Sequence, residues 1–137
     1  MNLAAALARL NYSAPVLEPG HVWLAGAGIG DAGSLTIDVL SGLAQADAVV
    51  HDALVDPALL DVAQGAELLF AGKRAGQPSM KQDAINTLLV RLAREGRKVL
   101  RLKGGDPYVF GRGGEEALAL AQAGISFRVL SGVTAAA

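Results

Sequence analysis

Three places in this sequence carry side chains that could do chemistry where an apolar run ends. Asp52 directly follows Val49-Val50, where a partly desolvated carboxylate could act as a general base. Lys73 and Arg74 follow another apolar run, and two adjacent cations suit an anionic ligand. Arg112 stands between two glycines, where its planar guanidinium could hold a carboxylate. Each has an ordinary alternative, because aspartates often cap helices or form turns and surface cations are usually solvated.

The stretch from Arg101 to Glu116 is the strongest indication of a binding site. It leaves an apolar run and is then too rich in glycine for a strand or a helix. Gly104 and Gly105 would let main-chain groups approach a ligand closely. Pro107 keeps Asp106 away from helical geometry at the end of the preceding strand. A tight turn without a ligand would explain these four residues alone, but the second glycine cluster that follows favours a site.

Apolar runs alternate with turn residues along the chain, and this pattern predicts the elements that position these side chains. Short apolar runs predict β-strands at residues 22–25, 48–50, 68–71, 99–102 and 127–130. Helices are expected between them, at about 35–43, 57–63, 80–95 and 114–123. The expected N-terminal caps are Ser34 or Thr36, Asp56 followed by Pro57, and Ser79 with Gln82 as a capping box. Gly96 and Gly124 are expected to end helices, and Glu115 and Glu116 to begin one without any chemical role.

This alternation of strands and helices predicts an α/β fold. We expect an open, mostly parallel five-stranded sheet with helices on both faces, because crossovers between parallel strands are right-handed helical connections. Residues 1–20 are predicted to be an N-terminal extension and 21–137 one α/β domain, with Ser13 to Gly20 as a strap leading to the first strand. The residues that follow the strands should then meet at one edge of the sheet, where such folds bind ligands.

Composition excludes several other classes. A net charge of −1 gives no field to attract a nucleic-acid backbone, so no nucleic-acid partner is expected. The chain has no cysteine and two histidines, so no metal site is expected. No apolar run approaches the ~20 residues of a membrane-spanning helix, and the first ten residues make a poor signal peptide. A cytoplasmic location is expected by default.

Gly26-Ala-Gly-Ile-Gly-Asp31 is close to a dinucleotide-binding fingerprint, but its spacing is wrong. The fingerprint would need glycine where Asp31 stands, and an acidic side chain there would face a pyrophosphate. A nicotinamide-binding Rossmann domain of an oxidoreductase is therefore the second interpretation. A non-catalytic binding fragment is a third.

Several motifs together resemble the tetrapyrrole methylases, most closely the branch that methylates uroporphyrinogen III. They are Gly26 to Asp31, Asp52-Ala-Leu-Val55, Gly72-Lys-Arg-Ala-Gly76 and Leu102 to Glu116. The resemblance implies transfer of methyl groups from S-adenosyl-L-methionine to uroporphyrinogen III, giving precorrin-2 for sirohaem and cobalamin. It also implies a homodimer of two-domain subunits, with the cofactor between the domains. The second domain is missing from this chain, so we expect the fragment alone to be inactive.

The resemblance also assigns roles to individual residues. It implies that Asp52 is the proton acceptor and Lys73 the proton donor. The cofactor contacts implied are Ile29, Gly104, Gly105, Asp106, Val109, Thr134 and Ala135. The many carboxylates of such a substrate would account for Arg74 and Arg112. The family's usual proline and tyrosine are replaced here by Ile29 and His51, and Ser131 replaces a second proline.

Overall fold

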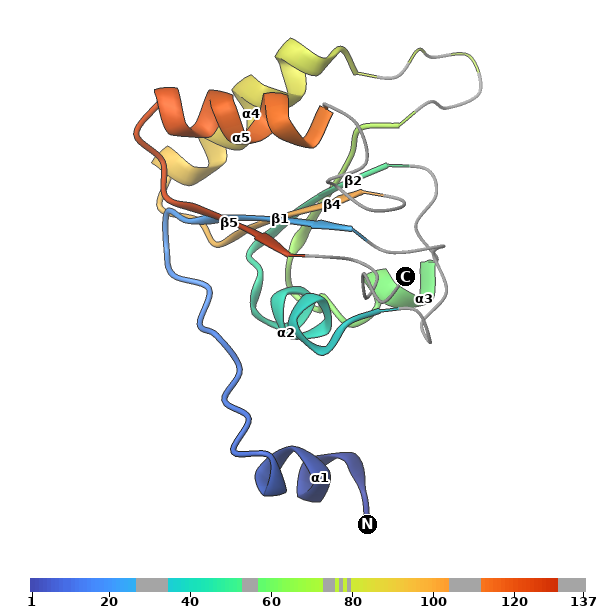
Figure 1. Ribbon diagram of the computed structural model, residues 1–137. Helices are drawn as coiled ribbons and strands as arrows, with labels where there is room; N and C mark the ends of the chain where they lie inside the picture. The colour runs from blue at the N-terminus through green and yellow to red at the C-terminus, as the bar shows by residue number, and fades with distance from the viewer. Residues whose placement is uncertain are drawn as a thin grey trace.

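The computed structural model describes residues 1–26, 35–52, 57–72, 76, 78, 80–103 and 112–130, the first two residues of the last range by their backbone only. Five strands form one sheet in the order β3-β2-β4-β1-β5 (Figure 1), and all of the pairs are parallel. They are β1 (Val22–Gly26), β2 (Ala48–His51), β3 (Glu67–Phe70), β4 (Val99–Lys103) and β5 (Phe127–Leu130). The predicted α/β class and the five-stranded sheet are confirmed.

Helices cover both faces of the sheet, as predicted. Figure 1 shows α4 (Gln82–Arg94) and α5 (Arg112–Gln122) on one face, with α2 (Ile37–Gln45) and α3 (Pro57–Leu60) on the other. Each face therefore has its own core. Trp23 and Leu100 pack with Leu43 of α2 on one side, and Val22 and Val99 pack with Leu89 of α4 on the other. All five residues of β1 are buried because the strand is covered from both sides.

Four of the predicted helix ends are found in the structure. The Thr36 hydroxyl caps α2 by accepting a hydrogen bond from the Val39 amide at 3.3 Å. Helix α3 begins at Pro57, although it ends at Leu60 rather than near residue 63. Gly96 and Gly124 have φ values of 80° and 72°, a left-handed conformation that suits glycine after a helix.

Two expectations about helix starts are wrong. The capping box fails because the N-cap of α4 is Lys81, which makes no side-chain cap; Ser79 lies outside the described residues. The Gln82 amide group instead donates to Asn86 and to Glu116, which is a tertiary contact. Helix α5 begins at Arg112, two residues before the predicted start, so this arginine lies on a helix and not in a glycine loop.

The N-terminal extension contains a short helix that the sequence analysis did not predict, α1 (Leu3–Arg9), none of whose residues is buried. A strap without regular structure then leads to β1. Gln45 of α2 holds the strap, because its side chain accepts from the Leu17 amide at 2.9 Å and donates to the Pro15 carbonyl at 3.0 Å. The Tyr12 hydroxyl donates to Asp38. No helix in the described part of the chain combines the length and apolar character needed to cross a membrane.

Candidate active site

The carboxyl ends of the strands form one edge of the sheet. In the register of the sheet, Gly26 at the end of β1 pairs with Lys103 at the end of β4, and Ala25 pairs with Leu130 of β5. On the other side of β4, His51 at the end of β2 pairs with Leu102 and with Phe70 of β3. Any segment that leaves a strand therefore starts from this edge, where parallel sheets bind ligands.

The strand order divides the predicted site residues into two groups. Asp52, Lys73 and Arg74 follow the neighbouring strands β2 and β3. The predicted cofactor contacts follow β1, β4 and β5, which are neighbours in the other half of the sheet. Of all these residues, Asp52 is described in full and Arg112 by its backbone. The others lie outside the described residues, namely Ile29, Lys73, Arg74, Gly104, Gly105, Asp106, Val109, Thr134 and Ala135.

Asp52 lines a cavity of about 260 Å³ at this edge. The residue before it, His51, fixes the end of β2 by packing its ring against Phe70, with ring centroids 5.4 Å apart. Two cations of β4, Arg101 and Lys103, line the same cavity. The remaining wall comes from Ala71, Gly72, Met80, Gln82 and Ile85. The cavity thus brings the predicted proton acceptor together with two cations that the sequence analysis had not selected.

Arg101 is buried, and its charge is balanced by Glu116 of α5. Its side chain is 4% exposed and that of Glu116 is 0% exposed, with Nε of the arginine 3.3 Å from Oε2 of the glutamate. The arginine Nη1 also donates to the carbonyls of Val50 and Leu102, both at 3.4 Å. These carbonyls belong to β2 and β4, so the guanidinium bridges two strands beside the cavity.

Two further polar side chains lie close to Oε2 of Glu116. Gln82 of α4 donates to Oε2 at 3.1 Å, and the Lys103 ammonium lies 3.9 Å from it. The other carboxylate oxygen, Oε1, is buried and has no hydrogen-bond partner among the described residues. One fully buried carboxylate thereby connects α4, α5 and β4.

This cluster was not predicted from the sequence. Residues 99–102 were expected to be an apolar strand, and Glu116 was expected to supply only a favourable charge at a helix start. A signal was available, however. Parallel strands in the centre of a sheet are buried on both faces, so Arg101 within such a strand requires a buried counter-ion.

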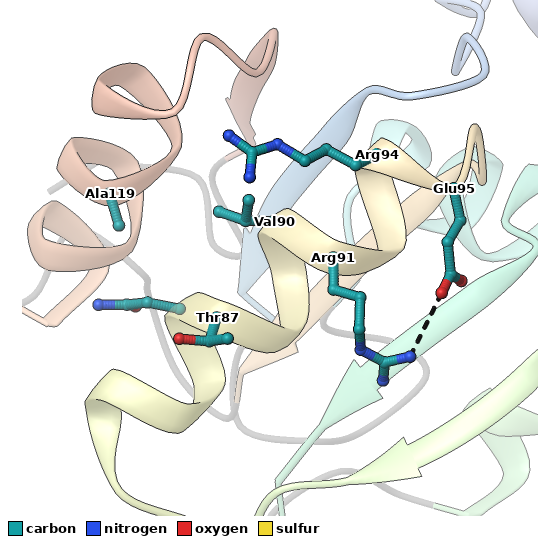
Figure 2. A pocket seen from close by; sticks show the side chains of 7 residues that line it. Thr87, Val90, Arg91, Arg94, Glu95 and Ala119 are labelled. Carbon is teal, nitrogen blue, oxygen red and sulfur yellow. Dashed lines mark hydrogen bonds and ion pairs between the residues drawn. The ribbon is translucent and has the colours of Figure 1, made fainter.

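A second hollow lies between α4 and α5 and holds none of the predicted residues. Figure 2 shows Val90 and Arg94 on the side of α4 that faces α5, with Ala119 of α5 on the opposite wall, and Arg91 turned away from α5 toward Glu95. Its volume is about 560 Å³. Arg91 is paired with Glu95 at 3.3 Å on the exposed surface. These arginines belong to the last turn of α4, away from the carboxyl edge, so this groove is separate from the Asp52 cavity.

The described ranges contain no group of three or more histidine and acidic side chains arranged to hold an ion. The charged residues of the Asp52 cavity instead suit proton transfer and the binding of polar groups.

Comparison with known proteins gives one consistent family. The profile of the Tetrapyrrole (Corrin/Porphyrin) Methylases matches residues 21–137. A uroporphyrinogen-III C-methyltransferase from Sinorhizobium is 59% identical over 122 residues, which are 88% of this chain and 44% of that protein. A siroheme synthase from Sodalis glossinidius is 58% identical over 119 residues, 86% of this chain and 25% of that protein. The chain thus spans less than half the length of these curated relatives.

Solved structures agree with this result. The uroporphyrin-III-C-methyltransferase of Thermus thermophilus is 52% identical with a TM-score of 0.74, over 84% of this chain and 48% of that one. A structure of the Thermus thermophilus enzyme complexed with S-adenyl homocysteine has a TM-score of 0.69 and 43% identity, over 83% of this chain and 45% of that one.

Proposed function

The chain belongs to the tetrapyrrole (corrin/porphyrin) methylases, and from this premise we propose that it forms the N-terminal α/β domain of a uroporphyrinogen-III C-methyltransferase. The enzyme would methylate uroporphyrinogen III to precorrin-2, with S-adenosyl-L-methionine as methyl donor, for sirohaem or cobalamin. The single observation that carries this proposal is the cavity at the carboxyl edge of the sheet, where Asp52 lies with Arg101 and Lys103.

The chemistry needs little from the protein beyond alignment and proton transfer. S-adenosyl-L-methionine, when bound, supplies a methyl carbon made electrophilic by the sulfonium. An electron-rich pyrrole carbon of the substrate forms the new C–C bond as the C–S bond breaks, and a ring proton must then leave. We assign the acceptance of that proton to Asp52, because its carboxylate is partly exposed in the cavity. Lys73 is the proposed proton donor.

The strand order supports a cofactor site in the other half of the edge. Three of the five strands, β4, β1 and β5, end side by side, and the residues proposed to contact the cofactor follow them. They are Ile29, Gly104, Gly105, Asp106, Val109, Thr134 and Ala135. The methyl donor would then lie next to β2 and β3, which carry the proposed acid and base. Arg74 and Arg112 are the proposed contacts to carboxylates of the substrate.

Quaternary structure and location are part of the same proposal. The family resemblance supports a homodimer that works in the cytoplasm, with a second domain completing each cofactor site. The oxidoreductase and non-catalytic alternatives receive no support from the relatives and structures compared above, all of which are named as methyltransferases or siroheme synthases.

The test is a methyl-transfer assay on the full-length protein under anaerobic conditions. Uroporphyrinogen III and S-adenosyl-L-methionine carrying a labelled methyl group should give labelled precorrin-2. A folded protein that binds S-adenosyl-L-homocysteine but transfers no label to the tetrapyrrole would refute the proposed substrate. Fluorescence enhancement of reduced nicotinamide on mixing would instead favour the oxidoreductase alternative.

A further inference from the structure

Arg101, Lys103 and Glu116 have so far been assigned no individual role beside Asp52. We propose that Arg101 and Lys103 bind one carboxylate arm of the tetrapyrrole in the Asp52 cavity, and that Glu116 is the positioning residue that holds both cations in its wall. The inference rests on the proposed function for the identity of the ligand. The geometry of the cluster is independent of it.

The guanidinium of Arg101 is fixed on one side and has donors left on the other. Its Nε donates to Glu116, and its Nη1 donates to the Val50 and Leu102 carbonyls. The third nitrogen, Nη2, has no hydrogen-bond partner among the described residues, while the residue lines the cavity. A planar guanidinium with one side anchored presents its remaining N–H groups in a fixed direction, which suits a carboxylate.

Glu116 cannot touch a ligand in the cavity, because it is fully buried and does not line the wall. Its Oε2 is shared by three cavity-lining side chains, since Gln82 and Arg101 donate to it and Lys103 lies 3.9 Å away. Each of these side chains has several rotatable bonds and would lose one of the contacts that fix its position without the shared acceptor. Glu116 therefore acts through its neighbours.

Charge and size restrict what the cavity can take. The described residues that line the cavity include two cations, Arg101 and Lys103, and one carboxylate, Asp52. The negative charge of Asp52 confines an anionic group to the side formed by the two cations. The volume of about 260 Å³ is below the roughly 300 Å³ at which small-molecule pockets begin, so the cavity fits a side arm and not the macrocycle.

A purely structural role is the competing explanation, in which the pair only docks α5 onto β4. Buried ion pairs can often be replaced by apolar residues of similar volume without loss of stability. The double variant Arg101→Met/Glu116→Leu therefore separates the two roles, since it restores an apolar contact but removes the ligand-binding donors. Glu116→Gln keeps the volume of the side chain and removes its charge.

The experiment measures binding of uroporphyrin III, a stable oxidised probe with the same carboxylate arms, to the full-length protein by fluorescence anisotropy. The double variant and Lys103→Met should each raise Kd at least about tenfold, as expected when charged hydrogen bonds to a carboxylate are lost. Glu116→Gln should raise Kd as well, although both cations are still present. The matched control is Arg91→Met/Glu95→Leu, which removes an exposed ion pair of the same type and should leave Kd unchanged.

Each outcome decides a separate point. Wild-type Kd in both Lys103→Met and the double variant would overturn the carboxylate site, and wild-type Kd in Glu116→Gln would overturn the positioning role. If the double variant does not fold, Lys103→Met and Glu116→Gln give the answer. Methyl transfer is assayed on the same preparations, so a wild-type protein that binds uroporphyrin but transfers no methyl group refutes the proposed function and leaves the Kd comparison valid.

Discussion

Asp52 is the described residue on which the proposed chemistry depends most directly. Asp52→Asn removes the proton acceptor but keeps the size of the side chain, so kcat of the full-length enzyme should fall by about 10²-fold or more. The rate of label transfer from the methyl donor measures this. Asp61→Asn is the matched control, because Asp61 is an exposed aspartate of the same region outside the cavity. A rate for Asp52→Asn equal to that of the control would remove Asp52 from the mechanism.

The buried pair of Arg101 and Glu116 makes a second prediction at this scale. Glu116→Leu leaves the guanidinium buried without its counter-ion, so the free energy of unfolding should fall by about 3–5 kcal/mol. Arg91→Ala breaks an exposed pair and should cost less than about 1 kcal/mol. Urea denaturation of both variants gives the comparison. Equal effects of the two substitutions would mean that the buried pair contributes no more than a surface pair.

Residue types and spacing predicted the position of Asp52 but not the cluster behind it. Asp52 could be found because it directly follows a strand, which is a local feature of the sequence. The contact between Arg101 and Glu116 depends on α5 returning over β4, so it is set by tertiary packing. Sequence periodicity does not indicate which buried charged side chains form a pair.

At the scale of elements, the strands were predicted to within a residue and the helix starts less well. The start of α4 was missed because Gln82 uses its amide in a contact with α5 and not in a local cap. Helix α1 was missed because none of its seven residues is buried, so it has no amphipathic pattern against a core. Sequence patterns therefore predict a helix start correctly when the expected local contact is the one that forms in the folded protein.

Gly42 lies where α2 packs closely against the sheet. A Cβ at this position would lie 3.0 Å from Trp23 Cε3 and 3.3 Å from Leu100 Cδ1. Gly42→Ala should therefore destabilise the protein, because overpacking costs about 1–3 kcal/mol and outweighs the gain of up to ~1 kcal/mol in helix propensity. Gly114→Ala is the matched control, since nothing lies within 4 Å of its Cβ position in α5. Tm, measured by thermal unfolding, should be lower for Gly42→Ala than for the wild-type protein and should not be lower for Gly114→Ala. A lower Tm for Gly114→Ala with an unchanged Tm for Gly42→Ala would contradict this packing.

At the scale of the whole molecule, the parallel sheet and its functional edge followed from the alternation of strands and helices. The strand order did not, because β1 and β4 each pair with two strands that are far from them in the sequence. This order has a functional consequence that no motif could provide. It gathers the proposed acid and base on one half of the edge and the proposed cofactor contacts on the other.

The N-terminal extension is tied to this body by a contact that depends on pH. The hydrogen bond that the Tyr12 hydroxyl donates to Asp38, together with partial desolvation, raises the pKa of Tyr12 above its usual value of 10.0. The folded state thus favours the protonated phenol, so this contact stabilises the protein below pH 10.0 and is lost as pH rises through the raised pKa.

This gives a prediction for tyrosinate absorbance. In the wild-type protein one tyrosine should titrate above 10.0, and Asp38→Asn should lower its midpoint because the charged acceptor is gone. Tyr12→Phe identifies the signal by removing it. An unchanged midpoint in Asp38→Asn would show that the extension is not held by this contact.

The place of β1 in the sheet has a consequence for synthesis of the protein. Val22 to Ala25 pair on one side with residues 99–102 and on the other with residues 127–130, so both partners of β1 leave the ribosome long after it. During that interval the apolar strand β1 has no neighbouring strand to pair with, and an unpaired apolar strand promotes aggregation. Slower translation or a larger supply of chaperones should therefore change the yield of this chain without any change in its finished fold.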